Sequence, residues 1–236
     1  MNWQPAPACL EPGRRLYAIG DAHGCADRLR ALHAAVRADL RDRPCAAATL
    51  VHLGDLIDRG PDSAGCVQAA LDFDACATVN LMGNHEDTAL LALAGEGYAC
   101  ADWLDTGGRP ALRSWGVSDL SPRASWAAGV PAHHRAFMAG MALHHRAGPY
   151  LFVHAGIRPG VPLEGQSRDD LLRIRRAFLD SEAAHGCVVV HGHSPTRDRQ
   201  PELRPNRINL DTGAVFEGGR LTLAVFEAAR VAFLQA

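Results

Sequence analysis

The chain has 236 residues, 47% of them hydrophobic, and a formal net charge of −2. This length and apolar share suffice for a sizeable core, so we expect residues 1–236 to form one domain. The charge shows no basic excess, which argues against nucleic-acid binding, and no apolar run is long enough to cross a membrane. All 24 basic residues are arginine, so a P-loop lysine and a Schiff-base lysine are excluded.

The seven cysteines are scattered and form no C-x-x-C pair. This pattern argues against a disulfide framework or a structural zinc site and favours a reducing compartment. Residues 1–12 lack the basic start and apolar core of a signal peptide. We therefore expect a soluble, cytoplasmic protein.

The first predicted element after the proline-rich start is a short buried strand over Leu16–Ile19. It runs into a Gly-rich loop that carries Asp21 and His23. Apolar residues at helical spacing then predict a helix over Cys25–Arg41. The loop between the two elements therefore places an acid and an imidazole at the end of a strand.

The second predicted strand, Ala48–Leu53, leads into Gly54-Asp-Leu-Ile-Asp-Arg-Gly60. Glycines at both ends suit a sharp loop where a strand brings backbone close to a ligand. Carboxylates suit a hard divalent cation, and a guanidinium suits phosphate. Our interpretation is that Asp55 holds metal, Asp58 supports a catalytic group and Arg59 grips phosphate.

A third unit repeats the arrangement. A helix over Ser63–Phe73 is followed by a predicted strand over Ala77–Met82, which ends in Gly83-Asn-His-Glu86. A helix rich in alanine and leucine then continues to about Ala94. Three successive β-α units thus place glycine and polar side chains directly after a strand, at the edge where open α/β sheets bind ligands.

Between about residues 95 and 141 the periodicity weakens. Trp103, Trp115 and Trp126, together with Gly107-Gly108, suggest a compact helical insertion with turns. Such an insertion could cap the site.

The second half resumes the strand pattern. Tyr150–Val153 is predicted as a strand ending at His154, and Cys187–Val190 as a strand ending near His193. A helix over Arg168–Leu179 lies between them. A β-meander is predicted to follow, with its hairpin turn at Gly218-Gly219. Its strands are expected at Ile208–Leu210, Ala214–Phe216, Leu221–Phe226 and Arg230–Leu234.

Six residues at strand ends beside glycine are candidate metal ligands: Asp21, His23, Asp55, Asn84, His154 and His193. Their mixed oxygen and nitrogen donors suit manganese, iron, zinc or cobalt better than calcium. A carboxylate such as Asp55 can bridge two ions. The alternative, that each polar residue is only a turn former, is reasonable for one motif. This turn-former alternative is much less reasonable for five such motifs in order along the chain.

Three further residues have less direct assignments. His85 adjoins Asn84 and could act as a general acid if Asp58 holds one ring nitrogen and raises its pKa. Arg175 shares a predicted helix with two other arginines, a pattern more typical of a solvated face. Asp211 we interpret as a structural residue that bonds nearby backbone.

These motifs together resemble a known signature. The segments around Asp21, Asp55, His85, His154 and His193 are similar to the phosphoprotein phosphatase signature of the calcineurin-like metallophosphoesterases. The similarity is closest to short bacterial and bacteriophage-lambda-type serine/threonine phosphatases, and it runs from about residue 16 to 226. It implies an α/β (α+β) fold, a β-sandwich flanked by helices, with a dimetal site at the carboxyl-terminal edge of the strands.

The resemblance also implies residue roles. A first metal would be bound by Asp21, His23 and Asp55, and a second by a set comprising Asp55, Asn84, His154 and His193. His85 with Asp58 would form an acid dyad, and Arg59 would bind phosphate. Arg175 aligns with an arginine that follows the His154 motif in the family, which strengthens its case as a phosphate ligand. Manganese is the metal expected first, with iron, zinc, nickel, cobalt and magnesium as alternatives.

The implied function is metal-dependent hydrolysis of phosphomonoesters by a hydroxide that bridges two metals. The implied substrate is a phosphoprotein, or a small phosphoester, with serine and threonine residues expected first and tyrosine also accepted by some short members. The nearest alternative is a dinucleoside-polyphosphate hydrolase, whose members tend to carry glutamine where His23 stands. A non-catalytic, metal-stabilised binding module is the alternative from another class.

The chain departs from the family pattern at two positions. Many relatives carry a basic residue directly before the Gly83 motif, where this chain has Met82, so one phosphate contact is expected to be absent or supplied elsewhere. A tryptophan often precedes the helix arginine by two positions, and here that residue is Arg173.

Overall fold

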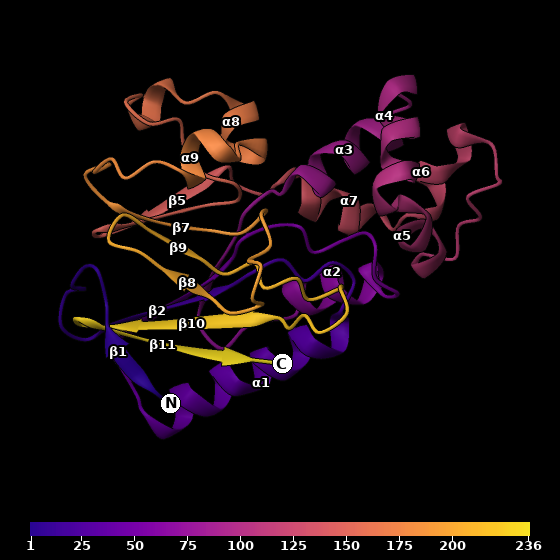
Figure 1. Cartoon of the computed structure of the whole chain (residues 1–236). Coiled ribbons are helices and arrows are strands. Elements are labelled where there is room, and N and C mark those ends of the chain that lie inside the picture. Colours follow the sequence, from indigo (N-terminus) through magenta and orange to yellow (C-terminus); the bar gives the residue numbers. More distant parts are fainter.

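The computed structural model describes residues 1–236, and four strands of the first half join two strands from the end of the chain in a six-stranded sheet (Figure 1). From edge to edge its strands are β1 (Trp3–Pro5), β11 (Arg230–Gln235), β10 (Thr222–Glu227), β2 (Arg14–Ile19), β3 (Ala47–His52) and β4 (Ala77–Asn80). β2, β3 and β4 are parallel, and the remaining pairs are antiparallel. The carboxyl ends of the three parallel strands therefore meet at one edge.

The second half builds a five-stranded sheet. Its order is β5 (His144–Ala147), β6 (Tyr150–Val153), β7 (Val188–His191), β9 (Arg207–Asn209) and β8 (Glu202–Leu203). β6, β7 and β9 are parallel, while β5 and β8 are antiparallel edge strands. Of the nine strands predicted from the sequence, eight are present within two residues at each end, and one, at Ala214–Phe216, is absent.

Alternate residues of the two sheets form a shared core between them. Leu16 and Val51 from the first sheet meet Tyr150, Phe152 and Ile208 from the second, and all five are at most 1% exposed. A strand buried on both faces has to be apolar on both, which is why these segments are continuous apolar runs. The β-sandwich implied by the resemblance is confirmed.

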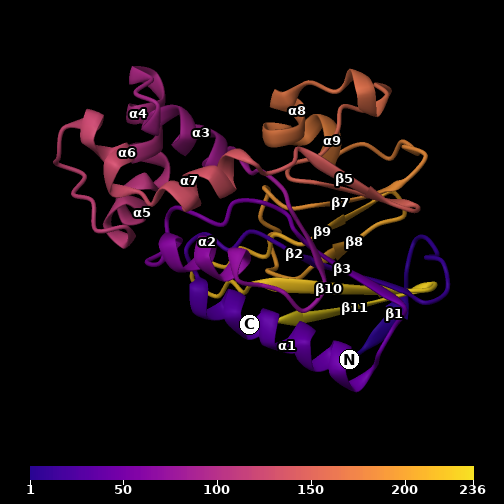
Figure 2. The same ribbon diagram turned by 180° about the vertical axis from the view of Figure 1, so that it is seen from behind.

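Helices cover the outer faces of the sandwich (Figures 1 and 2). The largest core cluster joins the outer face of the first sheet to α1 (Ala26–Asp42), α2 (Ser63–Leu71) and α3 (Asn84–Leu93). A smaller cluster joins the second sheet to α8 (Arg168–Arg173) and α9 (Arg176–Leu179). The result is a layered arrangement with helices on the outer face of each sheet.

The weakly periodic region is helical. It contains α4 (Gly97–Trp103), α5 (Arg109–Ser114), α6 (Trp126–Gly129) and α7 (Ala132–Ala139), with a π-helical turn at Leu104–Gly108. Short 3-10 turns occur at Arg123–Ser125 and Leu163–Gly165. None of the helices in the chain combines the length and apolar composition needed to cross a bilayer.

The predicted strand at Ala214–Phe216 is wrong, and so is the hairpin at Gly218-Gly219. The segment is a run of turns, because its carbonyls are taken by a side chain rather than by a strand. The guanidinium of Arg28 donates to the carbonyl oxygens of Ala214 (2.8 Å) and Gly219 (2.6 Å). The hairpin of the sheet instead joins β10 to β11.

The predicted continuous helix over Arg168–Leu179 is also wrong, since α8 and α9 are separated at Ile174 and Arg175. In an unbroken helix the carbonyl of Leu171 would accept the N–H of Arg175. Here it accepts the N–H of Ala155 at 2.9 Å instead. Arg175 consequently has a non-helical backbone, with φ −128° and ψ −108°.

A buried histidine pair ties α1 to the first sheet. Nε2 of His33 lies 2.8 Å from Nε2 of His52, and Nδ1 of His52 lies 2.7 Å from Oδ1 of Asn80. The Asn80 oxygen requires a proton on Nδ1 of His52, so His33 donates and His52 accepts. Burial lowers the pKa of His33 to about 3, with a further contribution from His52, and lowers the pKa of His52 to about 4.

This pair predicts acid-sensitive stability. Because the folded pKa values lie below the ordinary histidine value of ~6.5, the unfolded chain binds more protons between about pH 4 and 6.5. The unfolding free energy should fall as the pH falls through that window. In the His33→Gln variant the slope should decrease by up to ~1.4 kcal/mol per pH unit. Urea denaturation of metal-free protein at several pH values measures the slope.

The exposed His144 provides the control, since His144→Gln should leave the slope at the wild-type value. An unchanged slope in His33→Gln would contradict the prediction.

Candidate metal centre

The six candidate ligands lie at the shared edge of the two sheets. Each comes from a strand-end loop or from the helix start after it: Asp21 and His23 after β2, Asp55 after β3, Asn84 after β4, His154 after β6, and His193 after β7. The two sheets thus contribute to a single cluster, as the chain order of the motifs predicts. No side chain is tolerated at two glycines in these loops, because a Cβ at Gly83 would overlap Oδ1 of Asp55 and one at Gly192 would overlap Oδ1 of Asp21.

One half of the cluster surrounds Asn84. Its Oδ1 lies 2.8 Å from Nδ1 of His193 and 3.0 Å from Nε2 of His154. Nε2 of His154 is also 3.4 Å from Oδ2 of Asp55. Donor atoms of Asp55, His154 and His193 all lie within 4.8 Å of one another, a spacing that one ion can span.

The other half lies around Asp21 and His23. Oδ2 of Asp55 is 3.6 Å from Nε2 of His23, so the same carboxylate oxygen faces both halves. Oδ2 of Asp21 accepts the N–H of His193 at 2.8 Å, whereas Oδ1 of Asp21 is buried without a hydrogen-bond partner. An unpaired buried carboxylate oxygen is costly and suits a cation ligand.

The histidine tautomers suit metal binding. Nδ1 of His23 lies 2.9 Å from the carbonyl of Ile57, and Nδ1 of His154 lies 2.8 Å from the carbonyl of Leu53. A backbone carbonyl can only accept, so each ring is protonated at Nδ1 and presents Nε2 to the site. Nε2 of His193 is buried without a partner.

The electrostatics of the cluster also favour cations. Burial raises the pKa of Asp21 well above its usual range, and the nearby Asp211 raises it further. Burial likewise raises the pKa of Asp211 to about 6, even though its Oδ1 accepts the N–H of Gly213 at 2.9 Å, as the structural interpretation predicted. Burial lowers the pKa of His23 to about 3 and that of His193 to about 2, so both rings are neutral and able to bind metal. Divalent ions would relieve the repulsion among these acids and use the lone pairs of these rings.

His85 lies beside the ligands, since one of its ring nitrogens is within 4.8 Å of ligand atoms of His23 and Asp55, while its other nitrogen is held by a separate partner. Nδ1 of His85 lies 2.7 Å from Oδ2 of Asp58, and the indole N–H of Trp103 donates to both Asp58 oxygens, at 2.9 and 3.0 Å. Burial opposes protonation of His85, but Asp55 and Asp58 outweigh it and raise its pKa. Trp103 belongs to α4, so the helical insertion packs against the dyad.

Arg59 contacts both the ligand cluster, at His23, and the dyad, at His85. Its Nη1 is 2.6 Å from Nε2 of His23, and its Nη2 is 2.8 Å from Nε2 of His85. The backbone N–H of Arg59 donates to the carbonyl of Gly107 in the insertion, and its guanidinium carbon lies 5.9 Å from the exposed ring of Phe216. A metal bound to Nε2 of His23 would use the lone pair that Nη1 of Arg59 now contacts. The N–H groups of Nη1 would then be free to bind an anion.

The two arginines of the α8–α9 region have different positions. Arg175 is exposed at the break between the helices, and its charge contributes to the lowered pKa of His193, so it lies near the cluster. Arg168 reaches Met82, with Nη2 at 2.8 Å from Sδ, and pairs with Asp87 at 2.8 Å. A guanidinium therefore lies at the position where many relatives are expected to carry a basic side chain.

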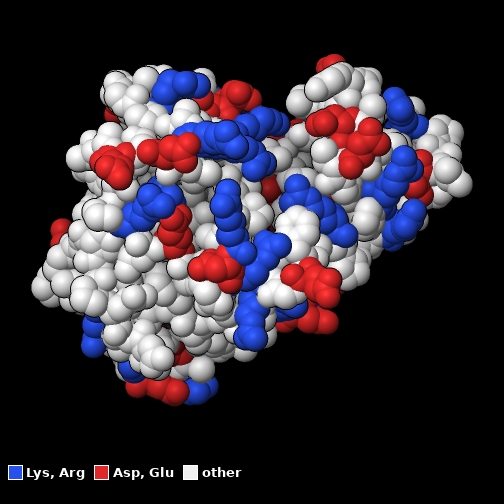
Figure 3. All heavy atoms as spheres, in the orientation of Figure 1, with Lys and Arg blue, Asp and Glu red and all other residues white.

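Figure 3 shows arginine side chains on both sides of the hollow between the second-sheet region and the helical insertion.

Backbone strain is concentrated in the motif loops. Seven residues other than glycine have a positive φ, and five of them are candidate site residues: His23, Asp55, Asp58, Arg59 and His193. Such conformations are costly and persist where the surrounding structure fixes them, which is typical of functional sites.

Glu86 fixes the strained loop and was not assigned a role from sequence, although it lies within the Gly83 motif. Its buried carboxylate accepts four backbone N–H groups, those of Asp55, Leu56, Ile57 and Gly83, at 2.8–3.2 Å. Burial, with the nearby charge of Asp55, raises the pKa of Glu86 to about 7. The residue thus joins two motif loops through their backbones.

Replacing Glu86 by glutamine should destabilise the protein. The amide has one accepting oxygen in place of two, so two buried N–H groups lose their partner, and we expect a loss of about 3 kcal/mol in unfolding free energy. Urea denaturation measures it. Glu96→Gln, at an exposed position in the insertion, is the matched control and should have no effect. A loss below about 1 kcal/mol would show that the loops do not depend on this carboxylate.

The β-sandwich carries carboxylates, an amide and imidazoles at one edge, next to the His85–Asp58 dyad and Arg59. This combination is that of a metal-dependent hydrolase of phosphate esters. Residues 14–226 match the family model described as calcineurin-like phosphoesterase, and the chain belongs to this family. The resemblance inferred from the motifs is confirmed.

Two relatives and one solved structure are similar to this chain. The chain is 32% identical to serine/threonine-protein phosphatase 1 of Salmonella typhimurium, over 89% of this chain and 91% of that protein. It is 27% identical to an asymmetrical bis(5'-nucleosyl)-tetraphosphatase of Bacillus velezensis, over 86% of each chain. A solved structure of a cold-active protein tyrosine phosphatase superposes with a TM-score of 0.62 at 16% identity, covering 96% of this chain and 81% of that one, and supports the fold alone.

Proposed function

We propose that the protein is a phosphoprotein phosphatase that hydrolyses phosphoserine and phosphothreonine, with phosphotyrosine as a further substrate. The observation that carries the proposal is Arg59, whose guanidinium lies between His23 of the ligand cluster and His85 of the dyad. A phosphate held by Arg59 would lie beside both groups. The 32% identity to a serine/threonine phosphatase supports the same choice of substrate.

The residues present fit two divalent ions, with manganese as the first candidate. Asp21, His23 and Asp55 would hold one, and the other would be held by Asp55 and the set around it: Asn84, His154 and His193. The unpaired oxygen of Asp21 and the unpaired nitrogen of His193 are the atoms that most need such a partner. When bound, the two ions supply an activated water and neutralise charge on the phosphate.

The remaining residues then have separable roles. Arg59 binds and orients the phosphoryl oxygens, and the exposed Arg175 supports them from the α8–α9 side. Asp58 holds the proton on Nδ1 of His85 and fixes the ring orientation. His85 donates the proton from Nε2 to the leaving oxygen, which makes departure of a serine or threonine alkoxide feasible.

The second candidate is hydrolysis of bis(5'-nucleosyl) tetraphosphates, supported by the 27% identity to a tetraphosphatase. His23 favours the phosphatase, because relatives of the hydrolase branch tend to carry glutamine there. The test is kcat/KM with manganese on a panel of phosphoserine, phosphothreonine and phosphotyrosine peptides and on diadenosine tetraphosphate. Peptide turnover at least tenfold more efficient is expected. The reverse order would favour the second candidate, and no turnover with manganese, nickel, cobalt or magnesium would favour a binding module.

A further inference from the structure

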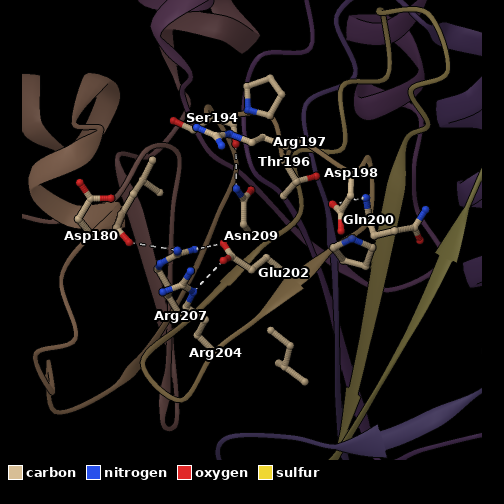
Figure 4. A pocket seen from close by; sticks show the side chains of 14 residues that line it. Asp180, Ser194, Thr196, Arg197, Asp198, Gln200, Glu202, Arg204, Arg207 and Asn209 are labelled. Carbon is tan, nitrogen blue, oxygen red and sulfur yellow. Dashed lines mark hydrogen bonds and ion pairs between the residues drawn. The ribbon is translucent and has the colours of Figure 1, made fainter.

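A cavity lies next to the loop that follows the candidate ligand His193 (Figure 4). It has a volume of about 720 Å³ and lies between the end of α9 and the strands β8 and β9. The loop that follows His193 forms one wall, Leu179 and Asp180 another, and Arg207 with Asn209 the strand side. We call this cavity the Ser194–Asn209 pocket. Its size is in the range of ligand sites.

Buried polar atoms without partners gather at this pocket. Six such side-chain atoms exist in the protein, and three of them belong to residues that line the pocket: Ser194 Oγ, Thr196 Oγ1 and Arg207 Nε. Two of the others, on Asp21 and His193, belong to the candidate metal cluster. Each unmet buried group costs about 1–3 kcal/mol unless something pairs with it. The pattern indicates that the pocket, like the metal cluster, is built to receive a polar ligand.

The side chain of Arg207 is held in a fixed position at the pocket. The residue is 2% exposed, its Nη1 donates to Glu202 at 2.6 Å, and its Nη2 donates to the carbonyl of Leu179 at 3.1 Å. Only its Nε lacks a partner. The guanidinium is therefore fixed in place by the protein, while the N–H of its Nε has no partner.

The chemistry of the lining excludes several ligands. Only two of the fourteen lining residues are hydrophobic and none is aromatic, so a purine base has no ring to stack on. Three arginines are balanced by three acids, so the lining does not select a strongly anionic chain: Arg197, Arg204 and Arg207 against Asp180, Asp198 and Glu202. Hydroxyls that can both donate and accept suit the alternating C=O and N–H groups of a peptide.

One wall of the pocket begins at the metal edge, because Ser194 directly follows the candidate ligand His193. On the other side, α9 ends at Leu179, which lines the pocket. An extended peptide advances about 3.3 Å per residue. When a phosphorylated side chain lies at the metals, the residues that flank it are therefore the part of a substrate that would extend past Ser194 into the pocket.

We propose that the Ser194–Asn209 pocket binds the peptide backbone next to the phosphorylated residue of a protein substrate. The inference rests on the proposed function and adds the part of the substrate that the metal edge does not contact. Thr196 and Arg197 are its specificity residues, and neither belongs to the catalytic machinery.

The test compares a seven-residue phosphothreonine peptide with p-nitrophenyl phosphate, which fills only the metal edge. Thr196→Val removes one hydroxyl at nearly constant shape, and it should lower kcat/KM for the peptide about three- to tenfold through KM. Turnover of p-nitrophenyl phosphate should not change. Arg197→Gln should act in the same direction, and Arg123→Gln, at an exposed insertion position, is its matched control.

A length series separates recognition from structural support. The wild type should prefer the seven-residue peptide to a capped phosphothreonine, and Thr196→Val should reduce that preference. Equal losses of kcat/KM on the peptide and on p-nitrophenyl phosphate would overturn the inference. No loss on either substrate would also overturn it and would mean that the pocket holds water only. A loss confined to diadenosine tetraphosphate would assign the pocket to a nucleotide and overturn it too. Failure of the wild type to cleave any phosphopeptide would instead overturn the proposed function itself, together with the inference that rests on it.

Discussion

Asp55→Asn should lower kcat/KM about a thousandfold, equivalent to ~4 kcal/mol in the activation barrier. The expectation rests on one oxygen, Oδ2, which lies 3.6 Å from Nε2 of His23 and 3.4 Å from Nε2 of His154. No other carboxylate in the cluster faces both histidines. An amide of the same shape keeps the fold of the loop but removes the charge shared by the two proposed metals, so both should bind more weakly. A phosphothreonine peptide assay with saturating manganese measures the loss.

Metal linkage gives a readout that does not depend on turnover. A ligand that binds only the folded state raises the melting temperature according to its concentration and affinity. Manganese should therefore raise the Tm of the wild type, and the Tm of Asp55→Asn should respond much less. Asp27→Asn, fully exposed on α1, is the matched control and should behave as the wild type. Wild-type turnover together with a wild-type Tm response in Asp55→Asn would refute the assignment.

The positions of the candidate ligands could be predicted because their signals are local. Asp21, Asp55 and His154 each follow a short apolar, β-prone run and stand beside glycine. Parallel strands then bring such loops together at one edge without further information. The same reasoning placed Arg59 within the cluster, since it shares a seven-residue loop with Asp55.

The parts that could not be predicted depend on partners distant in the chain. Trp103 supports Asp58 from 45 residues away, and no periodicity in the insertion indicates that contact. The break before Arg175 occurs because Ala155 takes the carbonyl of Leu171, which a helical pattern cannot reveal. The segment around Ala214 has strand-like composition, yet Arg28 occupies its carbonyls. Two-residue and three-residue edge strands such as β1 and β8 are too short to carry a periodic signal.

His85→Asn should reduce kcat on a phosphothreonine peptide by about 10²–10⁴-fold, the usual contribution of a general acid. The loss on p-nitrophenyl phosphate should be much smaller, because nitrophenolate leaves without needing a proton. That difference separates loss of the acid from general damage to the site. Equal losses on both substrates would contradict the role of His85 as proton donor.

Asp58→Asn tests whether the two residues act as one unit. Asp58 accepts the Nδ1 proton of His85 at 2.7 Å and raises the pKa of that ring. Without the carboxylate charge the pKa of His85 should fall, and because the acid must be protonated, the basic limb of the kcat–pH profile should move to lower pH. If Asp58 acts only through His85, then adding Asp58→Asn to His85→Asn should cost little more than His85→Asn alone. If the losses of kcat in the two single variants multiply in the double variant, Asp58 does not act through His85. That result would refute the dyad.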